Sequence, residues 1–263
     1  MPVFRNIAIA IFFVSVISPS TFAAGQCSAK SGSETAAVLE LYTSEGCNSC
    51  PPADKWVSSL APNGFKADQI VPLAFHVDYW DYIGWKDRFA NSEFSGRHRD
   101  LARANGSGTV YTPQIFVSRK DIRLAFSNVK LNATLKQINP AKPGADIGLE
   151  LNASNPSTLN LRASASLADP EHNAGAQAYL AVYENKLSSN VKAGENRGVK
   201  LEHDYVVREF IGPLKFDRQG KLEVKQSVAV QSDWKLKHLG VAAFVQQRDS
   251  GETLQALQLP ACM

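Results

Sequence analysis

The sequence predicts an α/β domain over residues 24–140 followed by an antiparallel β domain over residues 145–263. An apolar run at residues 38–43 leads directly to the motif Cys47-Asn48-Ser49-Cys50. Strand-like and helix-like segments alternate from there, until residues 139–144, which contain two prolines and a glycine, end the alternation. Short segments of alternating polarity then follow one another, which is typical of antiparallel sheets.

The first 23 residues contain the three parts of a secretory signal. Arg5 supplies the positive start, residues 7–17 the apolar stretch, and residues 18–23 the small-residue cleavage region. A membrane anchor is the alternative, but the apolar stretch is about half of the roughly 20 residues that a spanning helix needs. We therefore expect residues 1–23 to be a cleaved signal peptide, and the mature protein to be periplasmic or secreted without a membrane anchor.

The charge of the chain is nearly balanced. It has 28 basic and 25 acidic residues, a net charge of +3, and loss of Arg5 with the signal leaves 27 against 25, or +2. So small a net charge provides no strong field for nucleic acid or for a membrane surface. We expect no nucleic-acid partner and no cofactor.

The predicted elements of the first domain have a recognisable order. Residues 70–78 are almost continuously apolar, which favours a parallel strand covered on both faces. Phe94, His98 and Leu101 stand at helical spacing before a stop at Asn105-Gly106. The expected strands are residues 38–43, 70–78, 110–117 and 123–126, and the expected helices are residues 53–60, 91–104 and 128–138. This order, β-α-β-α-β-β-α, is that of thioredoxin and glutaredoxin, so the first domain is predicted to be thioredoxin-like.

The second domain is predicted to resemble an antiparallel sandwich. Its expected strands are short and separated by turn residues. Residues 184–203 are long for a hairpin loop, and we leave open whether they are functional or disordered. The expected strands are residues 147–151, 158–165, 177–183, 204–211, 221–230, 240–246 and 253–259.

Two cysteines spaced i, i+3 at the start of a helix form a reversible dithiol. We expect Cys47 to attack and Cys50 to resolve, because the cysteine nearer the loop is normally the exposed one. Pro51 and Pro52 favour the opposite assignment, since a helix that begins at Pro51 places Cys50 at its cap. Nearby Glu45 and Asp54 oppose thiolate formation.

Two further segments are expected beside the dithiol, because strands that end on one sheet edge bring their loops together. Thr112-Pro113 is predicted to be a cis bond that lets a substrate backbone pair beside the sulfurs. His76 and Asp78 share a strand face and are expected to form a hydrogen-bonded pair, either as a proton shuttle or metal ligand or as a structural contact.

Glu40 is either a buried proton acceptor or a residue at a solvated edge. Three aromatic residues between the strands are predicted either to bind an extended peptide or to belong to the core, namely Trp80, Tyr82 and Trp85.

The other two cysteines stand at opposite ends of the mature chain. Chain termini often lie close together, so a structural disulfide between Cys27 and Cys262 is expected. The alternative is a pair of free thiols at frayed ends.

Three motifs resemble the signature of an exported bacterial family of thioredoxin-like proteins, domain of unknown function twelve twenty-three. They are Tyr42 to Asp54, His76 to Asp87, and Tyr111-Thr112-Pro113-Gln114, and the similarity continues through Glu195-Asn196-Arg197-Gly198, His203 with Val206-Val207-Arg208, and Gly240 to Gln246. The resemblance thus covers nearly all of the mature chain and implies the fold, but no established reaction. One departure is Ser118-Arg119-Lys120-Asp121, where such proteins often have a glycine.

These observations favour a periplasmic thiol–disulfide oxidoreductase that acts on exported proteins or small thiols, with or without a membrane redox partner. A first alternative is a Cu(I)- or soft-metal-handling protein that uses Cys47, Cys50 and His76 as ligands. A second is a binding module in which the two cysteines form a purely structural bridge.

Overall fold

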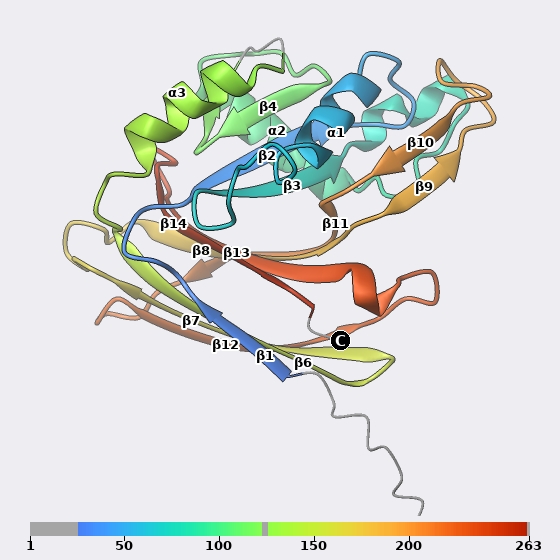
Figure 1. Cartoon of the computed structure of the whole chain (residues 1–263). Helices are drawn as coiled ribbons and strands as arrows, with labels where there is room; N and C mark the ends of the chain where they lie inside the picture. The colour runs from blue at the N-terminus through green and yellow to red at the C-terminus, as the bar shows by residue number, and fades with distance from the viewer. Residues whose placement is uncertain (1–25, 123–125, 262–263) are drawn as a thin grey trace, which may run out of the picture.

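The computed structural model describes residues 26–122 and 126–261. None of the helices in these two stretches combines the length and the apolar character needed to cross a bilayer. The predicted signal, residues 1–23, lies outside the described residues. The elements in chain order are β1 (Gln26–Lys30), β2 (Ala37–Thr43), α1 (Pro51–Ser58), β3 (Ile70–His76), the 3-10 helix η1 (Asp78–Ile83), α2 (Ser92–Ala104), β4 (Gln114–Val117), β5 (Lys120–Asp121), α3 (Asn128–Ile138), β6 (Ala145–Asn155), β7 (Thr158–Leu167), β8 (Ala176–Glu184), β9 (Leu187–Asn190), β10 (Lys200–His203), β11 (Val206–Lys215), β12 (Lys221–Ala229), the 3-10 helix η2 (Leu236–His238), β13 (Leu239–Gln247) and β14 (Thr253–Pro260) (Figure 1).

An eight-stranded mixed sheet forms the centre of the molecule, in the order β14-β13-β8-β11-β3-β2-β4-β5. Strands β2 and β3 run parallel in its middle, and every residue of both is buried. The prediction of a parallel strand covered on both faces near residues 70–78 is therefore confirmed. Such strands can be apolar throughout because neither face meets water.

The predicted fold class, a thioredoxin-like α/β domain followed by a sandwich-like domain, is wrong. The structure is built mainly of β-sheet, and strands from beyond residue 145 continue the same sheet as β2 and β3. The junction is β11, whose Val206 pairs in parallel with Ala74 of β3, and the Ala74 N–H donates to the carbonyl of Tyr205 at 2.8 Å. Sequence periodicity shows which face of a strand is apolar, but it does not show which strand fills the next edge.

Helices cover both faces of the β2–β3 region. Residues of β2 alternate between two cores: Leu39 and Leu41 pack with α1 and α3, whereas Val38 and Tyr42 pack with α2. The second core also contains residues of the far half of the chain, namely Ala181, Tyr183, Val207, Ala242, Phe244 and Ala256.

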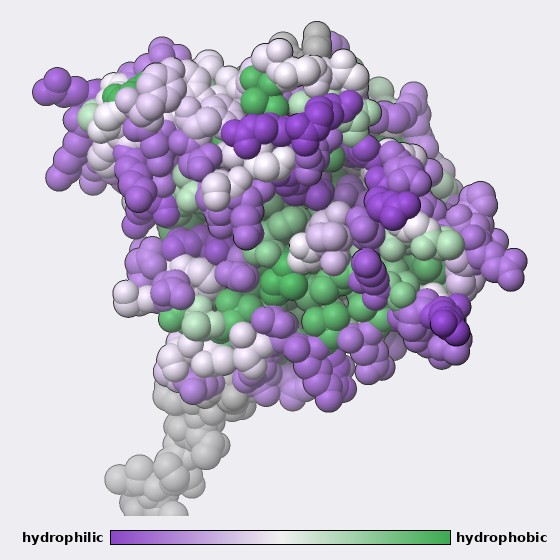
Figure 2. All heavy atoms as spheres, turned by 180° about the vertical axis from the view of Figure 1, so that it is seen from behind, coloured by the Kyte–Doolittle hydropathy of each residue, from purple (hydrophilic) through white to green (hydrophobic). Residues whose placement is uncertain are grey.

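A second sheet, in the order β1-β6-β7-β12, lies below β8 and β13 in Figure 1. Its inward side chains, such as Leu149 and Leu161, share an apolar core with Leu180 and Val241 of the large sheet. Seen from behind, apolar side chains gather in the lower half of the molecule, over these β layers (Figure 2). Strand β1 pairs with β6, so the start of the described chain crosses to the second sheet.

Most strand positions expected beyond residue 145 agree with the structure, from β6 through β14. The expected loop at residues 184–203 instead contains the β9–β10 hairpin, a separate two-stranded sheet. The strand expected at residues 123–126 falls partly outside the described residues, and β4 pairs with β5 through a tighter turn. Ser118 and Arg119 both take positive φ there, 46° and 70°.

Candidate functional site

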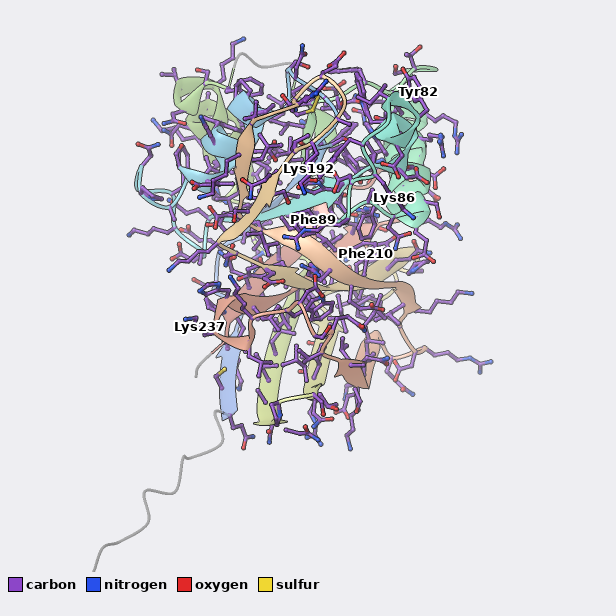
Figure 3. The ribbon with its side chains drawn as sticks, turned by 90° about the vertical axis from the view of Figure 1, so that its right-hand side faces the viewer. Tyr82, Lys86, Phe89, Lys192, Phe210 and Lys237 are labelled. Atoms are coloured by element: carbon purple, nitrogen blue, oxygen red, sulfur yellow. A yellow bond between two sulfur atoms is a disulfide. The ribbon has the colours of Figure 1, made fainter. Side chains whose placement is uncertain are left out.

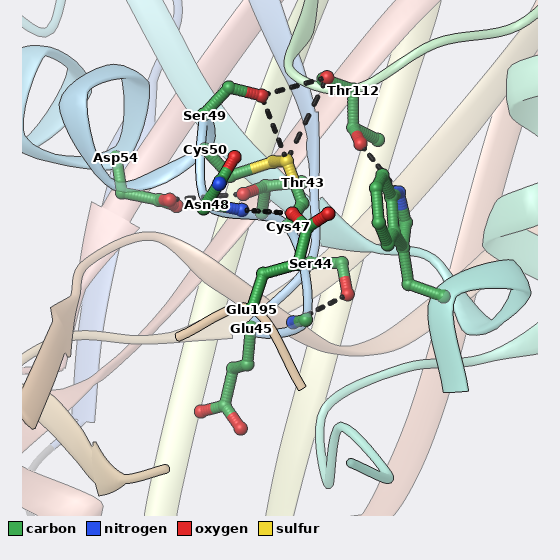
Figure 4. The surroundings of a disulfide bond; sticks show 12 residues. Thr43, Ser44, Glu45, Cys47, Asn48, Ser49, Cys50, Asp54, Thr112 and Glu195 are labelled. Carbon is green, nitrogen blue, oxygen red and sulfur yellow. Dashed lines mark hydrogen bonds between the residues drawn. A yellow bond between two sulfur atoms is a disulfide. The ribbon is translucent and has the colours of Figure 1, made fainter. Parts of the chain in front are cut away.

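The loop between β2 and α1 contains a disulfide between Cys47 and Cys50, with their Cα atoms 5.4 Å apart (Figure 4). Both cysteines are fully buried, while Asn48 and Ser49 between them are exposed. The expectation that Cys47 is the exposed cysteine is therefore wrong for this disulfide form. The sulfur of Cys47 lies 3.3 Å from the hydroxyl of Ser49.

Helix α1 begins directly after Cys50, with Pro51 and Pro52 at its first two positions. The carbonyl of Cys50 accepts from the backbone N–H groups of Ala53 and Asp54, at 2.9 and 3.1 Å. Prolines lack N–H groups, so the donors that a helix start usually offers to an anion are absent or already used here. This end of the helix gives little support to a thiolate.

The Thr112-Pro113 bond is cis, as predicted, and lies beside the disulfide. The sulfur of Cys47 is 3.7 Å from the carbonyl oxygen of Thr112. The indole of Trp80 donates to the Thr112 hydroxyl at 2.7 Å, which fixes this segment against η1. The structure thus brings Cys47, Thr112 and Pro113 together.

The three aromatic residues of the segment 80–85 have different surroundings. Trp80 and Trp85 are half-buried and use their indole N–H groups inside the site, the latter donating to Glu45 at 2.8 Å. Tyr82 is 83% exposed and lies at the outer edge of the molecule (Figure 3). Of the expected peptide-binding residues, Tyr82 is thus the one whose side chain is mostly open to solvent.

His76 and Asp78 do not pair with each other. His76 Nδ1 lies 2.7 Å from the carboxylate of Asp87, and Asp78 accepts from the hydroxyl of Ser95. Asp87 also accepts from the backbone N–H groups of Glu45 and Phe89. Burial alone would raise the pKa of Asp87, but His76 and these N–H groups outweigh it and lower the pKa. An ionised Asp87 accepts only, so Nδ1 of His76 donates to it, and Nε2 of His76 has no hydrogen-bond partner in the described part of the chain.

A buried charged group lies beneath the disulfide loop. His203 of β10 stands between two carboxylates: its Nε2 is 3.4 Å from Glu45, and its Nδ1 is 3.7 Å from Asp54. Burial would lower the pKa of His203, but Asp54 and Glu45 outweigh it and raise the pKa to about 10. Burial would likewise raise the pKa of Glu45, but its polar contacts, with His203 first among them, outweigh burial and lower the pKa.

The rings of His203 and His76 are 5.0 Å apart, and Phe89 packs against both. Among the described residues, one set of histidine, cysteine and acidic ligand atoms lies within 4.8 Å of one another: Asp54, His76 and His203. The sulfurs of Cys47 and Cys50 are not part of it.

The β9–β10 hairpin and its connecting loop cover this site from the far half of the chain. The side-chain amide of Asn196 donates to the carbonyls of Glu45 and Cys47, both at 2.9 Å. The backbone N–H of Asn48 donates to Glu195 at 3.0 Å. Phe89 lies below this hairpin in Figure 3. These residues belong to the family resemblance, but the sequence alone does not connect them with the dithiol, because no local pattern links positions about 150 apart.

Glu40 is neither a free proton acceptor nor a solvated edge residue. It is fully buried and receives two hydrogen bonds from Arg97, both at 2.7 Å, and one from Tyr42 at 2.8 Å. These contacts make its carboxylate a structural anchor between β2 and α2.

The predicted Cys27–Cys262 bridge stays a prediction, since Cys262 lies outside the described residues. The sulfur of Cys27 is 3.8 Å from the carbonyl oxygen of Pro260, two residues before the expected partner.

Comparison with solved structures finds similar folds. A crystal structure of an Agrobacterium tumefaciens protein is 24% identical, with a TM-score of 0.60, over 85% of this chain and 93% of that one. The protein HBP35 of Porphyromonas gingivalis is 17% identical, with a TM-score of 0.65, over 88% of this chain and 76% of that one. At these identities the likeness shows the fold alone.

No curated protein matches the sequence. The model of one protein family matches residues 38–246, which include the disulfide loop, the cis-proline segment and the β9–β10 hairpin. The chain therefore belongs to the family described as "Protein of unknown function (DUF1223)".

Proposed function

We propose that this protein is an exported thiol–disulfide oxidoreductase that exchanges disulfides with other exported proteins or small thiols through Cys47 and Cys50. The observation that carries the proposal is the position of the Cys47 sulfur, 3.7 Å from the carbonyl of Thr112 and next to Pro113. Of the two cysteines, Cys47 is thus the one in contact with the segment along which a partner would dock. The predicted signal at residues 1–23 supports an oxidising compartment, where a disulfide persists.

The reaction is a pair of exchanges. The Cys47 thiolate attacks one sulfur of a partner disulfide, forms a mixed disulfide and releases the other partner sulfur as a thiolate. The Cys50 thiolate then attacks the Cys47 sulfur, which closes the Cys47–Cys50 bond and releases the second partner sulfur. Run in reverse, the same steps oxidise a partner dithiol. Ser49, whose hydroxyl is 3.3 Å from the Cys47 sulfur, supports Cys47 as the attacking residue because it can donate to a thiolate there.

The test is to trap the mixed disulfide. Cys50→Ser protein, expressed with its signal, should accumulate partner bands on non-reducing gels that collapse with reductant, and Cys47→Ser should not. Bands with Cys47→Ser alone would reverse the two roles. A Cys47→Ser/Cys50→Ser double variant is the matched control.

One observation favours a second candidate, a structural bridge in a non-catalytic binding module: both cysteines are fully buried. A redox titration distinguishes the two functions. A structural bridge is expected to have a reduction potential below about −300 mV and to show no disulfide exchange on the time scale of an assay. A reversible potential above that range, together with trapped partners, supports the oxidoreductase.

A further inference from the structure

Four polar atoms that lack a hydrogen-bond partner meet in one buried place, beneath the disulfide loop. They are Oε1 of Glu45, Nε2 of His76, and both ring nitrogens of His203. His76 and Glu45 are fully buried, and His203 is 3% exposed. The atoms of Glu45 and His203 lie at ion-pair distance without a hydrogen bond, and Nε2 of His76 has neither kind of partner among the described residues. Buried polar groups are almost always hydrogen-bonded, so this group of atoms indicates a missing ion or water.

His76, Asp54 and His203 each contact a neighbouring side chain through one polar atom, which leaves a second polar atom available as a ligand. His76 contacts Asp87 through Nδ1, at 2.7 Å, so its Nε2 is the atom left without a partner among the described residues. Asp54 accepts at Oδ2 from the hydroxyl of Thr43, at 3.0 Å (Figure 4), and its Oδ1 is 3.7 Å from Nδ1 of His203. For His203, Glu45 lies on the Nε2 side and Asp54 on the Nδ1 side. Histidines that bind metals usually have a carboxylate on the second ring nitrogen, and both histidines have one here.

The site also has an approach from solvent. A cavity of about 400 Å³ lies between α1 and β10, and both Asp54 and His203 line it. Glu202 and Asp204 line the same cavity together with Lys55 and Lys200, so its lining carries both signs of charge, and Asp54 is the carboxylate that it shares with the site.

We propose that Asp54, His76 and His203 bind one divalent transition-metal ion of the zinc type. The free atoms lie within 4.8 Å of one another. Ligands about 2.0–2.1 Å from zinc in a tetrahedral site are roughly 3.4 Å apart, so the side chains need to close by up to about 1.4 Å. Two imidazoles and a carboxylate suit zinc, whereas Cu(I) prefers sulfur. The ion would join α1 and β3 to the hairpin that covers the dithiol, and its binding does not depend on the proposed exchange reaction.

The test uses untagged, chelator-treated protein with the Cys47–Cys50 bond intact, at pH 8. Ligation needs a deprotonated imidazole, so zinc has to displace the proton that the neighbouring carboxylates keep on His203. Calorimetric titration with Zn²⁺ should show one equivalent bound, and saturation should raise the melting temperature. Asp54→Asn, His76→Gln and His203→Gln should each weaken the affinity by more than about 100-fold. Exposed His172→Gln is the matched control and should bind like the wild type. The Cys47→Ser/Cys50→Ser variant should also retain the ion.

Circular dichroism without metal shows whether each variant folds. If the variants do not fold, X-ray absorption of the zinc-loaded wild type still identifies the ligands. Nitrogen and oxygen ligands that include two imidazoles are expected. Absence of stoichiometric binding, a sulfur in the coordination shell, or binding that survives in folded His203→Gln protein would overturn the proposal.

Discussion

His98 is a neutral histidine enclosed by the core between α2 and the sheet. Its ring stacks on Tyr42 with centroids 4.1 Å apart, its Nε2 bonds to Gln114 at 2.6 Å, and Tyr79 lies 3.3 Å from its Nδ1. Burial lowers the pKa of His98 to about 4, and the hydrogen bond that His98 donates to Oε1 of Gln114 offsets only part of this effect. The folded protein therefore resists protonation at a position that the unfolded chain protonates near pH 6.5.

This difference predicts a loss of stability in acid. Between pH 6.5 and 4 the unfolded state binds more protons at His98, so the free energy of unfolding should fall as the pH falls through this window. The contribution of His98 approaches about 3 kcal/mol at pH 4. His98→Asn should remove most of that contribution, which urea unfolding at pH 7 and pH 4.5 would measure. An equal loss in the wild type and the variant would contradict the assignment, and exposed His172→Asn is the control.

At the scale of the element, the start of α1 determines how well the dithiol can ionise. Pro51 and Pro52 remove two N–H donors, and the next two N–H groups are bonded to the carbonyl of Cys50. Glu45 and Asp54 lie close by with negative charge. Each of these features disfavours a thiolate, which favours the disulfide form.

Restoring a donor should shift that balance. Pro52→Ala returns one N–H to the first turn, so we expect a lower thiol pKa and a reduction potential higher by about 6–20 mV, given about 0.3–1 kcal/mol for charge at a helix end. Equilibration with dithiothreitol buffers measures the potential, and ultraviolet thiolate absorbance measures the pKa. Pro62→Ala, in the turn after the helix, should change neither value. A lower potential in Pro52→Ala would show that the prolines act through something other than the missing N–H.

At the scale of the whole molecule, Arg97 connects the two halves of the chain. It extends from α2, pairs with Glu40 of β2, and stands over the rings of Tyr179, Phe210 and Phe244, with its guanidinium carbon 4.7–5.4 Å from their centroids. The three rings belong to β8, β11 and β13. The ion pair therefore lies where the two halves share a core.

Breaking that pair should destabilise the entire fold. Arg97→Met leaves the buried Glu40 carboxylate without its partner and should cost about 3–5 kcal/mol in the free energy of unfolding. The Glu40→Leu/Arg97→Met double variant should recover part of this loss, because no charge then stays buried. Arg103→Met, which removes an exposed pair with Asp100 on the same helix, should cost less than about 1 kcal/mol. Urea unfolding measures all three.

The urea unfolding curves of these variants should show one transition, both by circular dichroism and by tryptophan fluorescence, because the two halves of the chain share the large sheet and this core. If Arg97→Met instead unfolds in two separate transitions, and β8, β11 and β13 keep the stability of the wild type, the two halves do not unfold as one unit.

The sequence by itself determined the local features of this protein. It located the cysteine pair after a buried strand, the cis bond before Pro113, and most strands beyond residue 145, and it placed the first helix at residues 53–60, two residues later than it begins. Each depends on residues close together in the chain, where spacing and proline chemistry act directly.

Only the tertiary structure decided which strand edges meet and which buried charges become neighbours. Alternation along β11 cannot reveal that Val206 pairs with Ala74, and nothing near His203 points to Asp54 or Glu45. Asp78 looked like the partner of His76 because both share a strand face, yet the chain turns into η1 at Asp78 and returns Asp87 to the histidine. Backbone edges and buried polar groups must be satisfied somewhere in the fold, but the partner that satisfies them is set by packing at long range.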